Sequence, residues 1–298
     1  MCSQQPNLFH HVWRQDLSHN QRRFDAIVIG SRQGGTPLAI SLAGEGWDVA
    51  LVERKAVGGT CVNEGCAPTK TMIASARIEY LVQLAGDFGV DVSSFSINLE
   101  RVIQRKRQVV ESFREGIKKR ILNSQNLSLI EGSAHFTRGR QLEVSLPNGN
   151  TKLLESDVTV INTGTSPAKA NIRGLDKVVA HDSTSIMELD KLQEHMIVIG
   201  GGYVGLEFGQ MFRRFGSKVT IIQNDKQLLS REDEDIASMV LEIMKDEGIE
   251  VLLGAEPVEV SSFADKISLT LKSPEKETTL VGSHLLLATG SLPNTPLI

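Results

Sequence analysis

One local pattern occurs twice along the chain, and this repeat constrains the fold more than any other feature. The pattern is an apolar run, a glycine turn, a helical stretch and a second apolar run. The first copy has its turn at Gly30 and ends at Glu53, and the second has its turn at Gly200 and ends at Gln223. In both copies the last residue follows the first glycine by 23 positions. Because strands that alternate with helices form parallel sheets covered by helices, the repeat predicts an α/β protein with two Rossmann-like, three-layer dinucleotide-binding domains.

The glycine turns indicate what the two copies bind. The second turn is a complete G-x-G-x-x-G pattern, whereas Arg32 occupies the middle position of the first. Such turns place backbone N–H groups and a helix N-terminus at a pyrophosphate. Arg32 either pairs with the phosphates or obstructs them. We predict nucleotide contacts from the glycines of both turns: Gly30, Gly34 and Gly35, then Gly200, Gly202 and Gly205.

The residues that end the two copies differ in charge. Glu53 is an acid, which is suited to accept hydrogen bonds from an adenosine ribose and repels a 2′-phosphate. Gln223 is neutral and does neither. Lys226 and Arg231 follow it closely and are candidates for contact with a 2′-phosphate. Both NADH and NADPH therefore stay open as the nucleotide of the second copy.

A cysteine pair follows the first copy. Cys61 and Cys66 are two of only three cysteines, and they lie between a strand-like and a helix-like run. Near a helix N-terminus, backbone N–H groups stabilise a thiolate, the reactive species in thiol–disulfide exchange. Lys70 follows Cys66 by one helical turn and can face the same way. The alternatives are two buried cysteines in an ordinary turn, or a structural zinc site, which would need two further ligands that no neighbouring residue supplies.

Further positions have a functional and a simpler interpretation. Thr163 and Gly164 end a buried-strand pattern and are expected to return the chain to the nucleotide, although a plain strand end is the alternative. Glu207 lies four residues beyond Tyr203 on the helix after the second turn, so both face one side. We expect Glu207 to reach Lys70 and form an ion pair, with an ordinary surface acid as the alternative.

A long amphipathic helix with one basic face is predicted near residues 99–121. Because an apolar stripe runs through it, we interpret the basic face as solvated, with a docking surface as the alternative.

Composition excludes several classes of function. The net charge is −4 with dispersed basic residues, which gives no support for nucleic-acid binding. No apolar run approaches the roughly 20 residues that span a bilayer. Residues 1–23 lack the apolar core of a secretory signal, so we interpret them as a flexible extension, with organelle targeting as the alternative. Sparse cysteine points to a reducing compartment, the cytoplasm, and Cys2 is interpreted as an incidental thiol.

Taken together, these motifs resemble the flavin-dependent pyridine nucleotide–disulfide oxidoreductases, the family of glutathione reductase, dihydrolipoamide dehydrogenase and mercuric reductase. The residues that carry the resemblance are the two glycine turns, Glu53, residues 58–70, Thr163, Gly164, Glu207 and residues 289–294. The resemblance covers residues 24–298, and residues 31–39 and 68–70 look most similar to the mercuric reductase branch. It implies an FAD-binding domain at 24–167 and an NAD(P)-binding domain at 168–298.

The resemblance also implies roles for individual residues. Hydride passes from NAD(P)H to FAD, and the reduced flavin opens a disulfide between Cys61 and Cys66. Cys66 then forms the charge-transfer thiolate and Cys61 meets the substrate, either mercuric ion or a disulfide. Lys70 and Glu207 match the pair beside the flavin, and Tyr203 matches the aromatic lid over it. The implied cofactor contacts are Gly30, Gly34, Gly35, Glu53, Arg54, Gly59, Thr60, Lys70, Ala134, Thr163, Gly164, Gly200, Gly202, Gly205, Gln223 and Gly290.

Parts of the family pattern have no counterpart before Ile298. These are a Gly-Asp turn that completes the FAD site and the C-terminal interface domain, which carries a His–Glu pair or, in mercuric reductase, a vicinal cysteine pair. We therefore expect the chain to be a fragment of a longer protein that is a homodimer at full length, with a naturally short flavoprotein as the alternative. The alternatives to a mercuric reductase-like enzyme are a dihydrolipoamide dehydrogenase-like enzyme, and a non-catalytic FAD- and NAD-binding redox module or inactive fragment.

Overall fold

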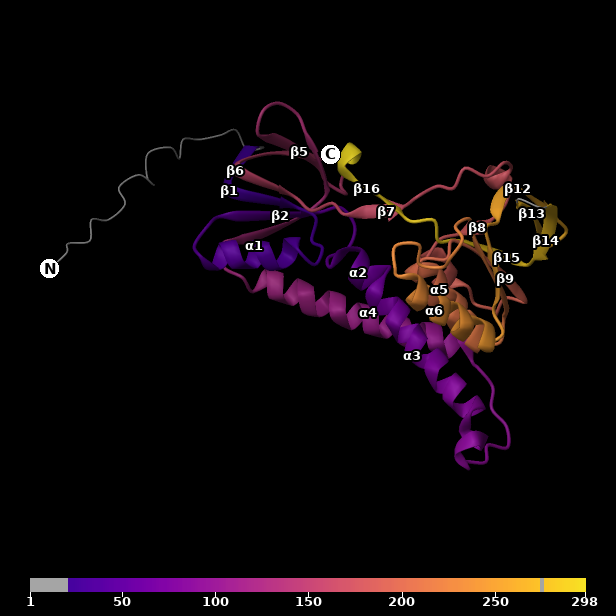
Figure 1. The fold of residues 1–298 in the computed structure, drawn as a ribbon. Helices are drawn as coiled ribbons and strands as arrows, with labels where there is room; N and C mark the ends of the chain where they lie inside the picture. The colour runs from indigo at the N-terminus through magenta and orange to yellow at the C-terminus, as the bar shows by residue number, and fades with distance from the viewer. Residues whose placement is uncertain (1–20, 274–275) are drawn as a thin grey trace. The chain divides into compact units, whose positions relative to one another are not determined.

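The computed structural model describes residues 21–273 and 276–298 (Figure 1). The chain forms two compact units. The first consists of the chain up to Lys55, Arg120–Asn162 and Leu297–Ile298, and the second of Ala56–Lys119 and Thr163–Pro296. The cysteine segment thus belongs to the same unit as the second glycine turn. The assignment of residues 24–167 and 168–298 to FAD and NAD(P) stays a prediction, and Cys2 lies outside the described residues.

The first unit is built on one six-stranded sheet with the order β3-β2-β1-β6-β5-β4. Its strands are β1 (Gln21–Ile29), β2 (Val49–Glu53), β3 (Leu127–Glu131), β4 (Ser133–Phe136), β5 (Gln141–Ser145) and β6 (Thr151–Ile161). β1 pairs in parallel with β2 and with β6, whereas β4, β5 and β6 pair antiparallel. Helix α1 (Gly35–Gly44) connects β1 to β2. This is the first predicted α/β half.

Burial explains the parallel part of this sheet. Val49, Ala50 and Leu51 of β2 and Ala26–Val28 of β1 have no exposed surface. Continuous apolar runs of this kind are typical of parallel strands covered on both faces. The predicted extension over residues 1–23 is wrong in its last residues, because β1 already begins at Gln21, which pairs with Leu153 of β6. The remainder of that extension lies outside the described residues.

The second unit contains a five-stranded parallel sheet with the order β11-β10-β9-β15-β8. Its strands are β8 (Ala180–His181), β9 (His195–Ile199), β10 (Lys218–Gln223), β11 (Glu250–Leu253) and β15 (His284–Leu287). An antiparallel sheet of β12 (Glu256–Phe263), β13 (Lys266–Lys272) and β14 (Glu277–Gly282) and a two-stranded ribbon of β7 (Thr165–Pro167) and β16 (Ser291–Pro293) complete it. The predicted repeat is therefore confirmed at the level of the fold.

The second unit contains the helices α2 (Gly59–Asn63), α3 (Cys66–Gln83), α5 (Tyr203–Arg214), α6 (Glu234–Asp246) and most of α4 (Leu99–Leu122). All of them except α2 contribute buried side chains to one apolar core. Short 3-10 helices lie at η1 (Ala85–Phe88), η2 (Leu175–Lys177), η3 (Ser185–Glu188) and η4 (Thr295–Leu297). Met72 of α3, Ile103 of α4 and Phe208 of α5 share this core, so the cysteine helix is fixed against the helix that follows the second glycine turn.

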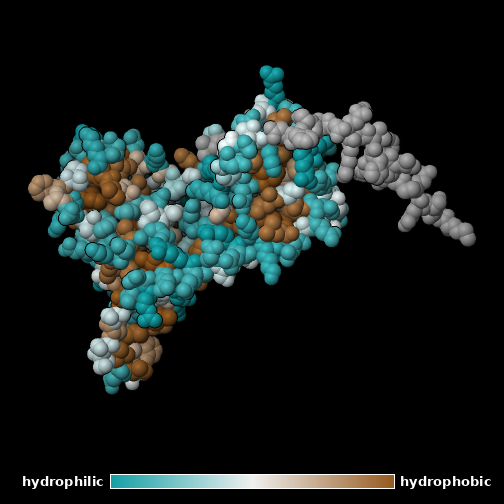
Figure 2. All heavy atoms as spheres, turned by 180° about the vertical axis from the view of Figure 1, so that it is seen from behind, coloured by the Kyte–Doolittle hydropathy of each residue, from teal (hydrophilic) through white to brown (hydrophobic). Residues whose placement is uncertain are grey.

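The far end of α3 and the segment after it leave apolar side chains exposed. Ile78 and Leu81 of α3, Phe88 of η1 and Phe95 are between 49% and 79% exposed. Brown spheres gather at this end of the unit in Figure 2. A contiguous apolar surface of this kind is typical of an interaction surface. In the part of the chain that the structure describes, no helix combines the length and apolar character needed to cross a membrane.

The strand orders position the candidate site. In the first sheet β1 lies between β2 and β6, and in the second β9 lies between β10 and β15. The strand that follows β1 in the chain, β2, lies on one side of it, and the later strand β6 lies on the other. β9 is flanked in the same way by β10 and the later strand β15. The strand order therefore changes direction at β1 and at β9, which makes each a topological switch point. Ligands of open α/β sheets bind beyond the carboxyl ends of strands at such points. Both glycine turns lie there.

Candidate active site

The first glycine turn is a tight bend closed by buried hydrogen bonds. Gly30 has a φ of 102° and donates its N–H to Val52 O at 2.8 Å. The buried carboxylate of Glu53 accepts the Ser31 N–H at 2.9 Å and the Ser31 hydroxyl at 2.7 Å. A Cβ on Gly35 would lie 2.1 Å from Gly30 O, so only glycine fits there. The turn therefore brings the start of α1 directly against the end of β1.

Asn162 braces this turn, and its part was missed from the sequence. Its amide Nδ2 donates to Gly30 O at 3.1 Å, and its backbone N–H donates to Ile29 O at 2.8 Å. In the sequence it stands out only as the residue that follows the last residue of β6, Ile161. The available signal was an amide side chain at the carboxyl end of a strand next to a glycine turn.

The remaining predicted contacts of the first unit have differing surroundings. Arg32, in the place of the second glycine, is partly exposed, and Arg54 is exposed directly after the buried Glu53. Ala134 is buried in β4 and packs in the apolar core of the six-stranded sheet. The role of these residues in cofactor binding stays a prediction.

The second glycine turn repeats the first in detail. Gly200 has a φ of 112° and donates its N–H to Ile222 O at 2.8 Å. Gln223 accepts the Gly201 N–H at 2.9 Å through Oε1, in the position where Glu53 accepts from Ser31. A Cβ on Gly205 would lie 1.9 Å from Gly200 O. Gly202, in contrast, has open space around its missing Cβ, with no atom within 4 Å.

This geometry fits a dinucleotide. Gly34 precedes α1 and Gly202 precedes α5, and within the described residues neither helix start receives a side-chain hydrogen bond from its cap. The first N–H groups of a helix need partners, and a phosphate satisfies them while meeting the positive end of the helix dipole. The open space at Gly202 leaves room for such a group to approach the backbone.

The cysteine pair lies at two consecutive helix starts. Cys61 is in the short helix α2, and Cys66 is the first residue of α3, after Gly65. Asn63 holds the intervening turn, since its Nδ2 donates to Val57 O at 3.0 Å and to Gly59 O at 2.9 Å. Gly59 and Thr60 begin α2, so the predicted cofactor contacts flank the sulfurs. Both cysteines are free thiols in this structure.

The two thiols differ in environment. Cys66 is exposed, whereas Cys61 is half-buried. Burial, together with a hydrogen bond with Cys66, raises the pKa of Cys61 to about 11. The prediction that a helix N-terminus stabilises the thiolate is therefore wrong for Cys61. Desolvation, which favours the neutral thiol, outweighs the few N–H groups of a five-residue helix.

Lys70 and Glu207 form the predicted ion pair. Lys70 lies one turn beyond Cys66 on α3, and its Nζ contacts Glu207 Oε1 of α5. The side chains are 61% and 39% exposed, so the pair faces solvent on one side. The cysteine helix and the helix of the second glycine turn are thus joined by a charge pair beside the thiols.

Tyr203 begins α5 and is held at its hydroxyl. The ring is 65% exposed, and the phenol donates a hydrogen bond to Glu232 Oε1. This bond raises the pKa of Tyr203, because the neighbouring carboxylate disfavours the phenolate. The sequence indicated the aromatic ring but not its partner.

The two Thr-Gly turns lie at opposite ends of one antiparallel ribbon. Gly164 has a φ of 68° and Gly290 of 96°, and the ribbon of β7 and β16 joins the segments that follow them. Asn294 donates its backbone N–H to Gly164 O at 2.8 Å and its Nδ2 to Thr163 O at 3.1 Å. Asn294 therefore holds Thr163 and Gly164 at one end of the ribbon. Gly290 lies at the other end, where its carbonyl oxygen accepts the Ala168 N–H at 2.9 Å.

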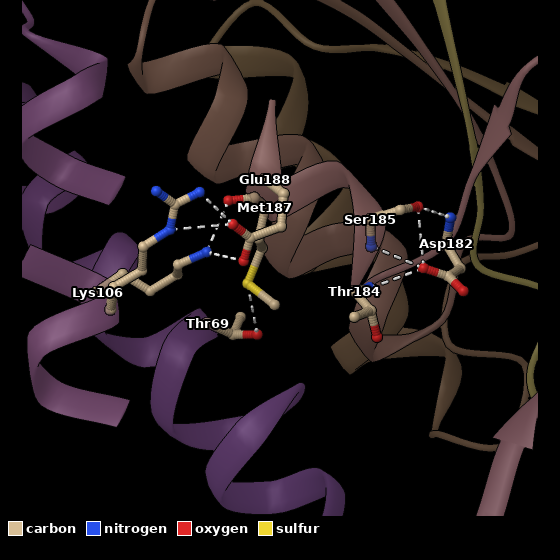
Figure 3. A network of polar contacts seen from close by, with 8 residues as sticks. Thr69, Lys106, Asp182, Thr184, Ser185, Met187 and Glu188 are labelled. Carbon is tan, nitrogen blue, oxygen red and sulfur yellow. Dashed lines mark hydrogen bonds and ion pairs between the residues drawn. The ribbon is translucent and has the colours of Figure 1, made fainter. Parts of the chain in front are cut away.

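A polar network ties α4 to η3 within the second unit (Figure 3). Lys106 is buried and donates to Met187 O at 2.9 Å, and with Arg107 it pairs with Glu188 at the end of η3. The Thr69 hydroxyl contacts the Met187 sulfur at 3.6 Å. The interpretation of the basic face of α4 as solvated is wrong for Lys106, because this side chain finds a carbonyl and a carboxylate inside the unit.

Comparison with known proteins relates the chain to flavin-dependent reductases. A family model for pyridine nucleotide-disulphide oxidoreductases matches residues 24–298. A mercuric reductase of Streptomyces lividans is 36% identical over 268 residues, which are 90% of this chain and 56% of that protein. A dihydrolipoyl dehydrogenase of Bacillus subtilis is 30% identical over 89% of this chain and 58% of its own length.

Among solved structures, the HOCl-induced flavoprotein disulfide reductase RclA of Escherichia coli matches with a TM-score of 0.79 and 33% identity. The match covers 91% of this chain and 57% of that one. The chain therefore spans little more than half the length of the relatives it matches. The resemblance stated from the sequence motifs is confirmed.

Proposed function

Because the chain belongs to the pyridine nucleotide-disulphide oxidoreductase family, we propose that it reduces a disulfide between Cys61 and Cys66 with NADH or NADPH and passes the electrons to a substrate. Enzymes of this family use FAD and a pyridine nucleotide. In the net reaction the nucleotide gives up two electrons and a proton as hydride, solvent supplies a second proton, and the disulfide becomes two thiols.

The observation that carries the proposal is the contact between Lys70 and Glu207. It places a charge pair between the helix of the cysteine pair and the helix that begins at the second glycine turn. A nucleotide held at Gly202 would lie at the start of α5, and the two sulfurs lie at the start of α3 and just before it. These two helices share one apolar core. An incidental pair of cysteines in an ordinary turn would need no such lysine.

Individual residues then have definite tasks. Bound flavin supplies the two-electron relay between the hydride donor and the disulfide. In the first unit, the turn at Gly30 and the N-terminus of α1 would hold a pyrophosphate. Glu53 would accept a ribose hydroxyl with the lone pairs that remain beside its bonds from Ser31 and from the Lys55 N–H. In the second unit, the ammonium group of Lys70 keeps positive charge near the thiols.

The environments of the two thiols support Cys61 as the protonated thiol of the reduced pair. Because the pKa of Cys61 is raised to about 11, Cys61 keeps its proton at neutral pH. Negative charge on the reduced pair is therefore not held by Cys61. This supports the assignment of the thiolate to Cys66, the first residue of α3, where helix N–H groups stabilise an anion.

For the substrate we favour mercuric ion, which would accept two electrons and become elemental mercury. The similarity to the mercuric reductase supports this choice, and the similarity to the dihydrolipoyl dehydrogenase supports an organic disulfide as the second candidate. We further propose that the complete protein is a homodimer in the cytoplasm. The exposed apolar side chains around Phe88 and the sparse use of cysteine support this.

The proposal is tested by counting thiols. Protein with Cys2 replaced by serine is loaded with FAD, oxidised, and titrated anaerobically with NADH and with NADPH. Two new thiols per chain are expected, and Cys66→Ala is expected to give none. Oxidation of the nucleotide without new thiols would refute disulfide reduction and favour the non-catalytic or purely flavin-reducing alternative. Addition of mercuric ion or oxidised lipoamide to the reduced protein then separates the two substrates.

A further inference from the structure

We propose that Asp225, and not the strand-end residue Gln223, is the acid that selects the ribose of the pyridine nucleotide, and that it makes the second unit prefer NADH over NADPH. This inference rests on the proposed function, because it concerns the nucleotide that the second glycine turn would bind. The strand end of β10 alone left the choice open, since Gln223 is neutral.

The amide group of Gln223 is committed within the protein. Its Oε1 accepts the Gly201 N–H at 2.9 Å, and its Nε2 donates to Asp225 Oδ2 at 2.9 Å. The side chain is 7% exposed and packs against Gly201, whose missing Cβ would lie 3.1 Å from Gln223 Cβ. Gln223 therefore closes the turn through Oε1 and holds an exposed carboxylate through an N–H of Nε2.

Asp225 is fixed in place while its carboxylate stays accessible. Its backbone carbonyl accepts the Gly254 N–H at 2.9 Å, and Oδ2 is held by Gln223. The residue is exposed, and Oδ1 remains able to accept a ribose hydroxyl. An acid that follows the second strand of such a half accepts hydrogen bonds from the 2′-hydroxyl of NADH and disfavours a 2′-phosphate.

The whole segment that carries Asp225 is bound to the glycine turn. Leu229 donates its N–H to Gly201 O at 3.0 Å, and the Tyr203 hydroxyl donates to Glu232. Between residues 225 and 235 the segment has five acidic and two basic residues. The two basic side chains, Lys226 and Arg231, are exposed. A 2′-phosphate would therefore enter a negative field and meet a fixed carboxylate.

The test measures binding without catalysis. ADP-ribose and 2′-phospho-ADP-ribose carry the discriminating ribose and cannot transfer hydride, so their dissociation constants report on the site alone. We expect the parent protein to bind ADP-ribose at least tenfold more tightly. Asp225→Asn, which keeps the shape and an acceptor for Gln223, should reduce that ratio at least fivefold. Asp246→Asn, an exposed acid at the end of α6, is the matched control and should leave the ratio unchanged.

The outcomes separate this inference from the proposed function. Tighter binding of the 2′-phosphate form, an unchanged ratio in Asp225→Asn, or a tenfold loss of 2′-phospho-ADP-ribose binding in Lys226→Ala would overturn the assignment of Asp225 and leave the enzyme proposal standing. If neither compound bound, both the nucleotide site and the assignment would be refuted.

Discussion

Lys70 and Glu207 are 137 residues apart in the chain and form an ion pair between α3 and α5. Both side chains are more than one-third exposed, so the pair contributes at most about 1 kcal/mol to stability. Its position one turn beyond Cys66 indicates that its task is electrostatic. The pair therefore gives a prediction in which stability and activity separate.

We expect Lys70→Gln and Glu207→Gln to leave the melting temperature nearly unchanged and to slow the nucleotide-dependent appearance of thiols. Loss of one preorganised charge at a reacting centre costs roughly a hundredfold in rate. The measurement is anaerobic stopped-flow detection of thiols after mixing with NADH or NADPH. Arg77→Gln, two turns further along α3 and exposed, is the control and should react at the parent rate. Equal rates in all three variants would remove Lys70 from the mechanism.

Cys61 and Cys66 should differ in the rate at which they are alkylated. Since burial raises the pKa of Cys61 from 9.0 to about 11, its thiolate fraction near pH 8 is reduced by roughly a hundredfold. In reduced protein that lacks Cys2, iodoacetamide should modify Cys66 first, as followed by peptide mass spectrometry. Modification of Cys61 should accelerate with rising pH up to about 11. The Cys66→Ala variant tests the contribution of the neighbour, because removal of its hydrogen bond should lower the pKa of Cys61 and accelerate its alkylation. Faster alkylation of Cys61 than of Cys66 at pH 7 in the parent protein would contradict the assignment.

Replacement of two glycines of the second turn by alanine should have different effects on stability and on nucleotide binding. A Cβ at position 205 would meet Gly200 O at 1.9 Å, so Gly205→Ala should unfold or strongly destabilise the second unit, by an estimated ~3 kcal/mol or more. A Cβ at position 202 meets no atom within 4 Å, and the backbone there is extended. Gly202→Ala should therefore keep its stability and lose nucleotide binding, because the methyl group occupies the space that a pyrophosphate needs. Thermal melting and ADP-ribose titration distinguish the two outcomes.

Much of this arrangement could be predicted from the sequence because it depends on local pattern. Two apolar runs, a glycine turn and an amphipathic helix define each half, and the structure confirms both. The partners that depend on long-range packing could not be predicted. Asn162 reaches Gly30 only because β6 pairs with β1, and Asn294 reaches Thr163 only because β16 pairs with β7. The pKa of Cys61 likewise follows from burial, which no local motif encodes.

The hydroxyl of Tyr203 offers a pH-dependent measurement. The hydrogen bond to Glu232 raises the pKa of Tyr203, so the phenol keeps its proton at a pH where a free tyrosine ionises near 10. The chain has two tyrosines, and Tyr80→Phe leaves Tyr203 alone for detection. Absorbance at the tyrosinate band should then show that the pKa of Tyr203 lies above that of a free tyrosine. Glu232→Gln should lower this pKa. Titration at the same pH in both proteins would show that the contact with Glu232 is not populated.

The contacts of Lys106 with η3 should contribute to the free energy of unfolding, because they hold α4 against η3. Lys106→Met leaves the carbonyl of Met187 without its donor and removes one partner of Glu188, so we expect a loss of about 1–3 kcal/mol. Lys119→Met, on the exposed part of the same helix, is the control and should change stability little. Urea unfolding at pH 7 is the measurement, and equal midpoints for the two variants would show that the buried lysine contributes nothing.

The contacts of Glu188 in this network predict that the stability of the protein depends on pH. Although partial burial opposes it, hydrogen bonds from Lys106 and Arg107 lower the pKa of Glu188 below its usual value of 4.5. A carboxyl whose pKa is lowered by folding stabilises the protein above the pKa of the unfolded chain, and this contribution is lost as the pH falls through the folded value. Glu188→Gln should therefore lower the urea midpoint at pH 7, and the difference from the parent protein should shrink below pH 4.5. A difference that stayed constant down to pH 3 would mean that the charge of Glu188 is not what holds α4 to η3.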